Sequence, residues 1–135
     1  MQKLFKDFAK KHGLKLVSVG FSYHWCDYSI LCSPLEFCAV MEKAKYVITT
    51  TFHGSIFSVL NHKQFLSIPL SGKTNDILKR LGLSDIAVSF DELSESVMEE
   101  KLFKTNIDYN AVDEKINIMK MASARLLEER LERFK

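Results

Sequence analysis

The order of apolar and polar residues predicts alternating helices and strands from the start of the chain. Apolar side chains recur at helical spacing over residues 2–12, and Gly13 follows where a helix commonly ends. Residues 14–19 alternate between apolar and polar side chains, as a strand does. Residues 20–32 follow neither period and predict a loop that holds four aromatic side chains.

A second helix is predicted over residues 33–43 from its first turn. Ser33 is a favourable cap, Pro34 suits the first helical position, and Glu36 completes a capping box. Short strands and helices then alternate along the chain. We expect strands at residues 46–50, 65–69 and 86–90, helices at residues 55–60, 75–81 and 92–100, and a long final helix over about 109–135, with Val112, Ile116, Met119, Leu126 and Leu127 on its apolar side.

This alternation predicts the fold class. Strands joined by single helices pair in parallel, because a parallel neighbour requires a crossover connection. We therefore expect an α/β fold: a Rossmann-like parallel sheet with helices on both faces. A length of 135 residues suits one domain with its own core. Because a parallel sheet usually begins with a strand and this chain begins with a helix, we expect it to be part of a longer protein.

Composition excludes several classes of protein. No apolar run is long enough to span a membrane, and the start of the chain does not resemble a signal peptide. The three cysteines, Cys26, Cys32 and Cys38, predict reduced thiols in a cytoplasmic protein. Residues 1–80 carry 11 basic and 5 acidic side chains, which suits a small anion, whereas nucleic acid would need a denser basic stripe.

The best candidate site lies at residues 49–55, between a predicted strand and a predicted helix. Ligands of parallel α/β sheets bind at the carboxyl ends of the strands. The first N–H groups of a helix bind phosphate or carboxylate, Gly54 allows close backbone approach, and His53 adds a titratable donor. The alternative is that His53 packs in the turn and the threonines serve as caps.

Three runs of sequence carry a resemblance to a known family. They are Ser33-Pro34-Leu35-Glu36-Phe37, Ala44-Lys45-Tyr46-Val47-Ile48-Thr49 and Phe52-His53-Gly54-Ser55-Ile56-Phe57-Ser58. The similarity covers roughly residues 14–90, and it resembles the C-terminal part of the polysaccharide pyruvyl transferase family. This resemblance implies the donor-binding half of a two-domain, glycosyltransferase-B-like enzyme. It also implies that the missing N-terminal domain is a partner and that this piece folds alone but does not catalyse alone.

The resemblance implies transfer of the enolpyruvyl unit of phosphoenolpyruvate to two hydroxyls of a sugar, as in exopolysaccharide biosynthesis, with no metal or other cofactor. His53 matches the family's donor-site histidine and is the expected catalytic residue. Thr51 stands where the family usually has serine, and Lys73 stands where an arginine is frequent. The residues expected to bind the donor substrate are Thr50, Thr51, Phe52, Gly54, Ser55 and Lys73.

Several alternatives stay open at this stage. The chain could instead belong to a nucleotide-sugar transferase or be a non-catalytic binding module. His24 and the three cysteines fit no common zinc spacing. Tyr23, Trp25 and Tyr28 are candidates for stacking on an acceptor sugar, with a lid over the core as the alternative. The lysines of residues 2–15 favour a solvated face over a contact with anionic lipid, although an enzyme acting on a lipid-linked glycan would work at the inner face of the membrane.

Overall fold

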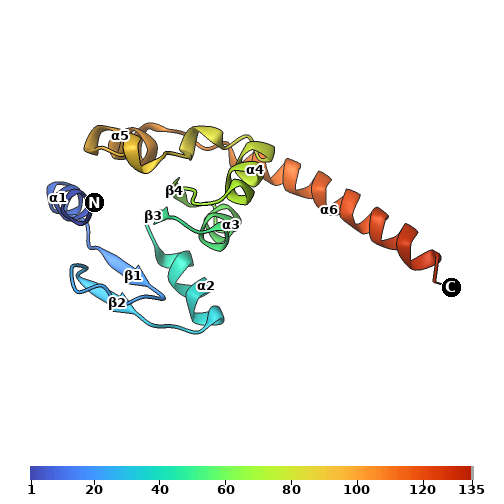
Figure 1. Ribbon diagram of the computed structural model, residues 1–135, viewed down its shortest axis with the longest axis horizontal. Helices are drawn as coiled ribbons and strands as arrows, with labels where there is room; N and C mark the ends of the chain where they lie inside the picture. Colours follow the sequence, from blue (N-terminus) through green and yellow to red (C-terminus); the bar gives the residue numbers. More distant parts are fainter. Residues whose placement is uncertain (135) are drawn as a thin grey trace.

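The computed structural model describes residues 1–134 as a mixed α/β fold, as expected (Figure 1). Its central pair of strands is β3 (Tyr46–Thr49) and β4 (Gln64–Ser67), which run parallel with Val47 opposite Phe65. Helix α3 (Phe52–Leu60) forms the crossover between them, and α4 (Gly72–Arg80) follows β4. Parallel pairing through a helical connection is therefore confirmed for these strands.

Both faces of the central sheet are covered. Phe65 points into a core with Leu78 of α4 and Val112 of the last helix, while its neighbour Leu66 points into a second core with Phe8 and Met98. Side chains of successive strand residues alternate between the faces of a sheet, so β4 feeds both cores. Helix α1 (Gln2–Lys11) covers the second face, and it ends one residue short of the predicted range of 2–12, with His12 as its C-cap.

The expectation of a fourth strand, at residues 86–90, is wrong. Here the chain makes a single parallel bridge, between Ser67 and Ala87, flanked by the short 3₁₀ turns η1 (Ser84–Ile86) and η2 (Phe90–Glu92). The physical reason lies in a local capping box. The Ser89 N–H donates to Glu92 Oε2 over 3.1 Å, which curls the chain away from the sheet.

A second small sheet corrects the expectation of a loop at residues 20–32. Strand β1 (Val17–Val19) pairs in parallel with β2 (Tyr28–Ile30), and Ser18 lies opposite Ser29. Their hydroxyls are 2.9 Å apart. A strand of three residues is too short to show a period, so the pattern of the sequence did not reveal it.

The remaining helices differ from expectation mainly at their ends. Helix α2 (Pro34–Lys43) has the predicted capping box at Ser33. The helix expected at residues 92–100 starts later, as α5 (Glu95–Glu99), because Ser94 caps it by accepting from the Val97 N–H over 3.2 Å. It continues as the π-helical turn η3 (Glu100–Lys104).

The long final helix is confirmed as α6 (Tyr109–Glu132), and Lys135 lies outside the described residues. Its first half packs on the body through Val112, with Ile116 and Met119 beside it. The second half projects away from the body (Figure 1). Leu126 and Leu127, expected on the apolar side of the helix, are more than half exposed because the body ends before them. Among residues 1–134, no helix is long and apolar enough to cross a membrane.

Candidate functional site

The candidate site is built on the first turn of α3, directly after β3. Thr51 is the N-cap, and its Oγ1 accepts the Gly54 N–H over 3.0 Å. The helix therefore starts at Phe52 rather than at residue 55 as expected, and His53 lies within its first turn. The helix begins early because Thr51 caps it well. At the N-cap position, a threonine hydroxyl oxygen accepts a helix N–H that has no intrahelical acceptor.

A second threonine supports this cap from the strand. Thr49 Oγ1 accepts the Thr51 N–H over 3.2 Å and lies 3.3 Å from Thr51 Oγ1. A Cβ added to Gly54 would lie 2.9 Å from Thr51 Oγ1 and closer still to Thr49 Oγ1. Glycine is thus required here by the approach of the chain's own threonines. The half-buried Thr50 lies between Thr49 and Thr51 in the chain.

Ser55 lies beneath the turn. Its side chain is fully buried, and its hydroxyl is 3.1 Å from both the Thr51 carbonyl oxygen and Ser67 Oγ of β4. A buried hydroxyl with two partners satisfies its hydrogen-bonding needs within the protein. The structure places this side chain where it ties α3 to the end of β4.

Lys73 comes to the same place from the next helix. It lies in the first turn of α4, which starts at Gly72 rather than at residue 75 as expected, and its Nζ is 4.4 Å from the centroid of the Phe52 ring. The Phe52 and His53 rings meet edge to face, with centroids 5.7 Å apart. The structure therefore brings Phe52, His53 and Lys73 together across two neighbouring helix starts.

This arrangement is suited to binding a small anion. The first intrahelical bond of α3 runs from the Ser55 N–H to the Thr51 carbonyl over 3.1 Å, so the N–H groups of Phe52 and His53 precede the hydrogen-bonded ladder. They lie at the positive end of the helix dipole. The exposed His53 imidazole and the Lys73 ammonium add one titratable donor and one fixed charge.

The cysteines and aromatic residues singled out from the sequence lie elsewhere. Cys26, Cys32 and Cys38 are half-buried free thiols, and burial raises the pKa of Cys26. Tyr23 and Trp25 stack with ring centroids 5.4 Å apart, whereas Tyr28 stands exposed on β2.

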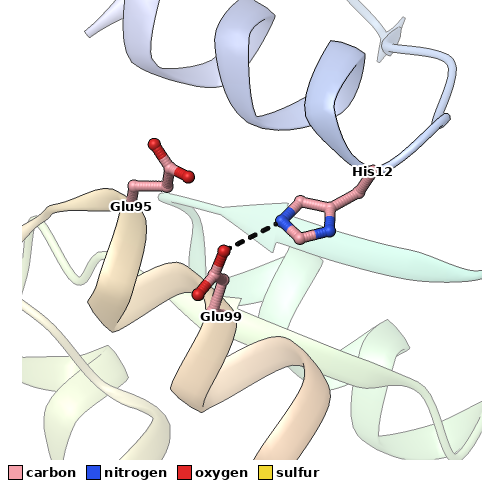
Figure 2. A group of neighbouring side chains, drawn as sticks. All are labelled: His12, Glu95 and Glu99. Carbon is pink, nitrogen blue, oxygen red and sulfur yellow. Dashed lines mark hydrogen bonds and ion pairs between the residues drawn. The ribbon is translucent and has the colours of Figure 1, made fainter.

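Within residues 1–134, one group of side chains lies close enough to share a metal ion: His12, Glu95 and Glu99 (Figure 2). His12 Nε2 is 3.1 Å from Glu99 Oε1. Lys11 also contacts both carboxylates, with its Nζ 3.1 Å from Glu99, so the chain itself supplies the positive charge that they require. We call these four residues the α1–α5 ion-pair cluster.

The α1–α5 ion-pair cluster was not predicted from the sequence. Its one visible signal is the spacing of Glu95 and Glu99, four residues apart on one helix face. Hydrogen bonding from Lys11 lowers the pKa of Glu99, and hydrogen bonding to Glu95 raises that of Lys11. The cluster fastens α1 to α5.

The fold and the candidate site together define an α/β protein with a helix N-terminus suited to binding a small anion. The family model of polysaccharide pyruvyl transferase matches residues 2–72, just over half of the chain. The chain belongs to the polysaccharide pyruvyl transferase family, a family of transferases, as the resemblance implied. The match includes the first turn of α3 and ends one residue before Lys73. No curated protein and no solved structure matches the chain.

Proposed function

We propose that the chain binds phosphoenolpyruvate at the first turns of α3 and α4 and takes part in forming a pyruvate ketal on a glycan. The observation that carries the proposal is the meeting of Lys73 with Phe52 beside His53, at a helix start with unpaired N–H groups. Membership of the pyruvyl transferase family supports a transferase with a polysaccharide acceptor.

The donor's chemistry fits the groups present. Phosphoenolpyruvate carries a phosphate and a carboxylate, which the N–H groups and the Lys73 ammonium can bind. Protonation of its C3 makes C2 cationic, and one sugar hydroxyl adds there with loss of its proton. Phosphate then leaves as the second hydroxyl adds, and the second hydroxyl proton goes to the departing phosphate. We assign His53 as the acid that protonates C3 or the donor that contacts the phosphate.

The remaining expected residues act through the shape of the turn. Thr51 and Gly54 set the direction of the first N–H groups through their mutual hydrogen bond, and Thr50 carries the chain from β3 into the cap. Ser55 fixes the turn from below. We therefore propose that Thr50, Thr51, Gly54 and Ser55 position the donor site, while Phe52, His53 and Lys73 face the substrate.

The same proposal includes the larger architecture. We infer that this α/β unit is the donor-binding, Rossmann-like half of a glycosyltransferase-B-like enzyme whose second domain completes the cleft. A cytoplasmic enzyme of this kind would meet a lipid-linked acceptor at the inner face of the membrane. The donor is itself a substrate, so the proposal includes no further cofactor.

Calorimetric titration of the full chain with phosphoenolpyruvate tests the donor site. We expect saturable binding that weakens at least tenfold in His53→Asn. His62→Asn is the matched control, because His62 is exposed and pairs with Asp113 on α6, outside the site. Binding of UDP-glucose in place of phosphoenolpyruvate would favour a nucleotide-sugar transferase and contradict the proposal. Binding of neither would favour a non-catalytic module.

A further inference from the structure

We propose a second binding site, for an anionic carbohydrate, where the connection between β1 and β2 meets α1. The inference rests on the proposed function, because a transferase that acts on a polysaccharide needs a surface that holds the glycan. Its evidence is separate, since it comes from a row of stacked aromatic rings and the lysines beside them. We call this row the aromatic ladder: Phe21, Tyr23, Trp25 and Phe5.

The aromatic ladder is continuous from the loop to the helix. Ring centroids are 6.1 Å apart for Phe21 and Tyr23, 5.4 Å for Tyr23 and Trp25, and 6.2 Å for Trp25 and Phe5. Neighbouring planes are within 28° of each other. Its inner end packs on the core through Phe5, but Phe21 is 63% exposed and Tyr23 44%. The outer rings thus contribute little to the core while presenting aromatic surface to water.

Hydrogen bonds hold the loop that carries Phe21, Tyr23 and Trp25. Ser18 Oγ donates to the Phe21 carbonyl over 2.8 Å, and the Tyr23 N–H donates to Ser29 Oγ over 3.2 Å. The Cys26 N–H donates to the Tyr23 carbonyl over 3.0 Å. A platform fixed in advance loses little conformational freedom when a ligand binds, which is a property of binding surfaces.

Beside the aromatic ladder lies an open hollow of about 360 Å³. Its volume falls in the range of small-molecule sites, which begins near 300 Å³. Cations, hydrogen-bonding groups and one aromatic ring converge on it. The residues that line it are Gln2, Lys3, Lys6, Asp7, His24 and Trp25.

These groups match a sugar that bears a phosphate or a carboxylate. One face of a pyranose ring consists of C–H bonds and packs against aromatic carbon, while its hydroxyls pair with groups such as Asp7 and Gln2. Lys3 and Lys6 supply charge for the anionic substituent. The rings already stack on one another and leave no slot for a nucleobase between them, which favours a carbohydrate over a single-stranded nucleic acid.

The hollow shares no residue with the donor site at α3 and α4. Trp25 is the single tryptophan of the chain, so its fluorescence reports directly on the hollow. We would titrate the full chain with glucose 1-phosphate and glucuronate, and in parallel with glucose and inorganic phosphate. We expect both anionic sugars to change the emission saturably, and glucose or phosphate alone to bind at least fivefold more weakly.

Variants connect the signal to the proposed groups. The double variant Lys3→Gln/Lys6→Gln should weaken binding of glucose 1-phosphate at least fivefold, as should Trp25→Ala measured by calorimetry, because these side chains line the hollow. Lys10→Gln is the matched control on the same helix, outside the hollow, and should bind as the unmodified chain does. Circular dichroism melts verify that each variant is folded.

Several results would overturn the second site. Inorganic phosphate could bind as tightly as glucose 1-phosphate, octauridylate could bind more tightly than either sugar, or the lysine variants could bind unchanged. The donor site is tested independently, because His53→Asn should leave glucose 1-phosphate binding unaltered. Displacement of glucose 1-phosphate by phosphoenolpyruvate would show one shared site and would also contradict the inference.

Discussion

The ammonium of Lys73 lies 4.4 Å from the centre of the Phe52 ring, and this contact joins the starts of two helices. Each helix follows one strand of the parallel pair β3 and β4, so both starts lie at the carboxyl edge of that sheet. The ring face attracts the cation and limits its range of positions. Lys73 is thereby kept over the Phe52 ring, at the helix start that also carries His53.

Replacing this lysine should weaken anion binding without unfolding the protein. Lys73→Gln removes the charge from the first turn of α4, and we expect about a fivefold to tenfold loss in affinity for phosphoenolpyruvate, equivalent to about 1–1.4 kcal/mol. Lys79→Gln, an exposed change in the last turn of the same helix, is the control and should bind normally. Equal affinity of both variants would remove Lys73 from the site.

Gly54→Ala should destabilise the fold. The new methyl group would press against Thr49 and Thr51, and such overpacking typically costs about 1–3 kcal/mol. Gly72→Ala is a matched change in the first turn of α4, where an added Cβ meets nothing within 4 Å. It should leave stability unchanged or raise it by up to about 1 kcal/mol. Urea unfolding followed by circular dichroism measures both.

A double variant identifies the cause of the Gly54 effect. Thr49→Ala removes the hydroxyl that lies nearest to the added methyl group. The loss caused by Gly54→Ala should therefore be smaller in the Thr49→Ala background than in the unmodified chain. Additive losses would contradict the proposed clash.

The α1–α5 ion-pair cluster should make stability depend on pH. The pKa of Glu99 is lowered in the folded state, so its contribution to the free energy of unfolding is complete above the ordinary value of 4.5. That contribution is lost as the pH falls from 4.5 through the lower folded-state pKa. At pH 7, Glu99→Gln should therefore unfold at a lower urea concentration than the unmodified chain. At pH 3 the two unfolding midpoints should differ less.

Lys11 sets the upper limit of the same window. Its pKa is raised above 10.5, so its contribution to the free energy of unfolding is present below pH 10.5 and is lost as the pH rises through the higher folded-state pKa.

Glu114→Gln is the control for Glu99→Gln, because Glu114 is exposed on α6. A difference between Glu99→Gln and the unmodified chain that stayed constant from pH 3 to pH 7 would contradict this account.

Shortening α6 should cost little stability. Leu126, Leu127 and Leu131 are 52–59% exposed, so a chain that stops after Ala124 keeps the packing of Val112 on the body. We expect the free energy of unfolding to change by about 0.5 kcal/mol or less, as for other surface changes. Urea unfolding measures the change, and a loss of several kcal/mol would show that the distal half supports the core.

Local patterns were predictable from the sequence, whereas distant pairings were not. The Ser33 cap is visible because all its partners lie within four residues. The early start of α3 was missed although its partners are local, because Gly54 in the first turn interrupts the helical pattern of the sequence. Ala87 forms a single bridge with Ser67, because Ser89 and Glu92 curl the chain away from the sheet. The alternating pattern of a strand does not show that this local capping box competes with strand pairing.

The candidate site shows the same division. The position of His53 at a strand–helix junction followed from the spacing of β3 and α3. The contact of Lys73 with Phe52 did not, because it depends on how α4 leaves the adjacent strand. The pairing of His12 with Glu99 joins residues 87 positions apart, which no local pattern can reveal.

The two parallel pairs, β1–β2 and β3–β4, are separate sheets rather than one. Cooperative opening follows hydrogen-bonded and packed units, so the two pairs can open on different timescales. Amides of β3 and β4 lie between two cores and should exchange with solvent deuterium at the rate of whole-molecule unfolding. Those of β1 and β2, where Tyr28 and Val17 face water, should exchange sooner. A glycan bound to the aromatic ladder would therefore slow deuterium exchange of the β1 and β2 amides before that of the β3 and β4 amides.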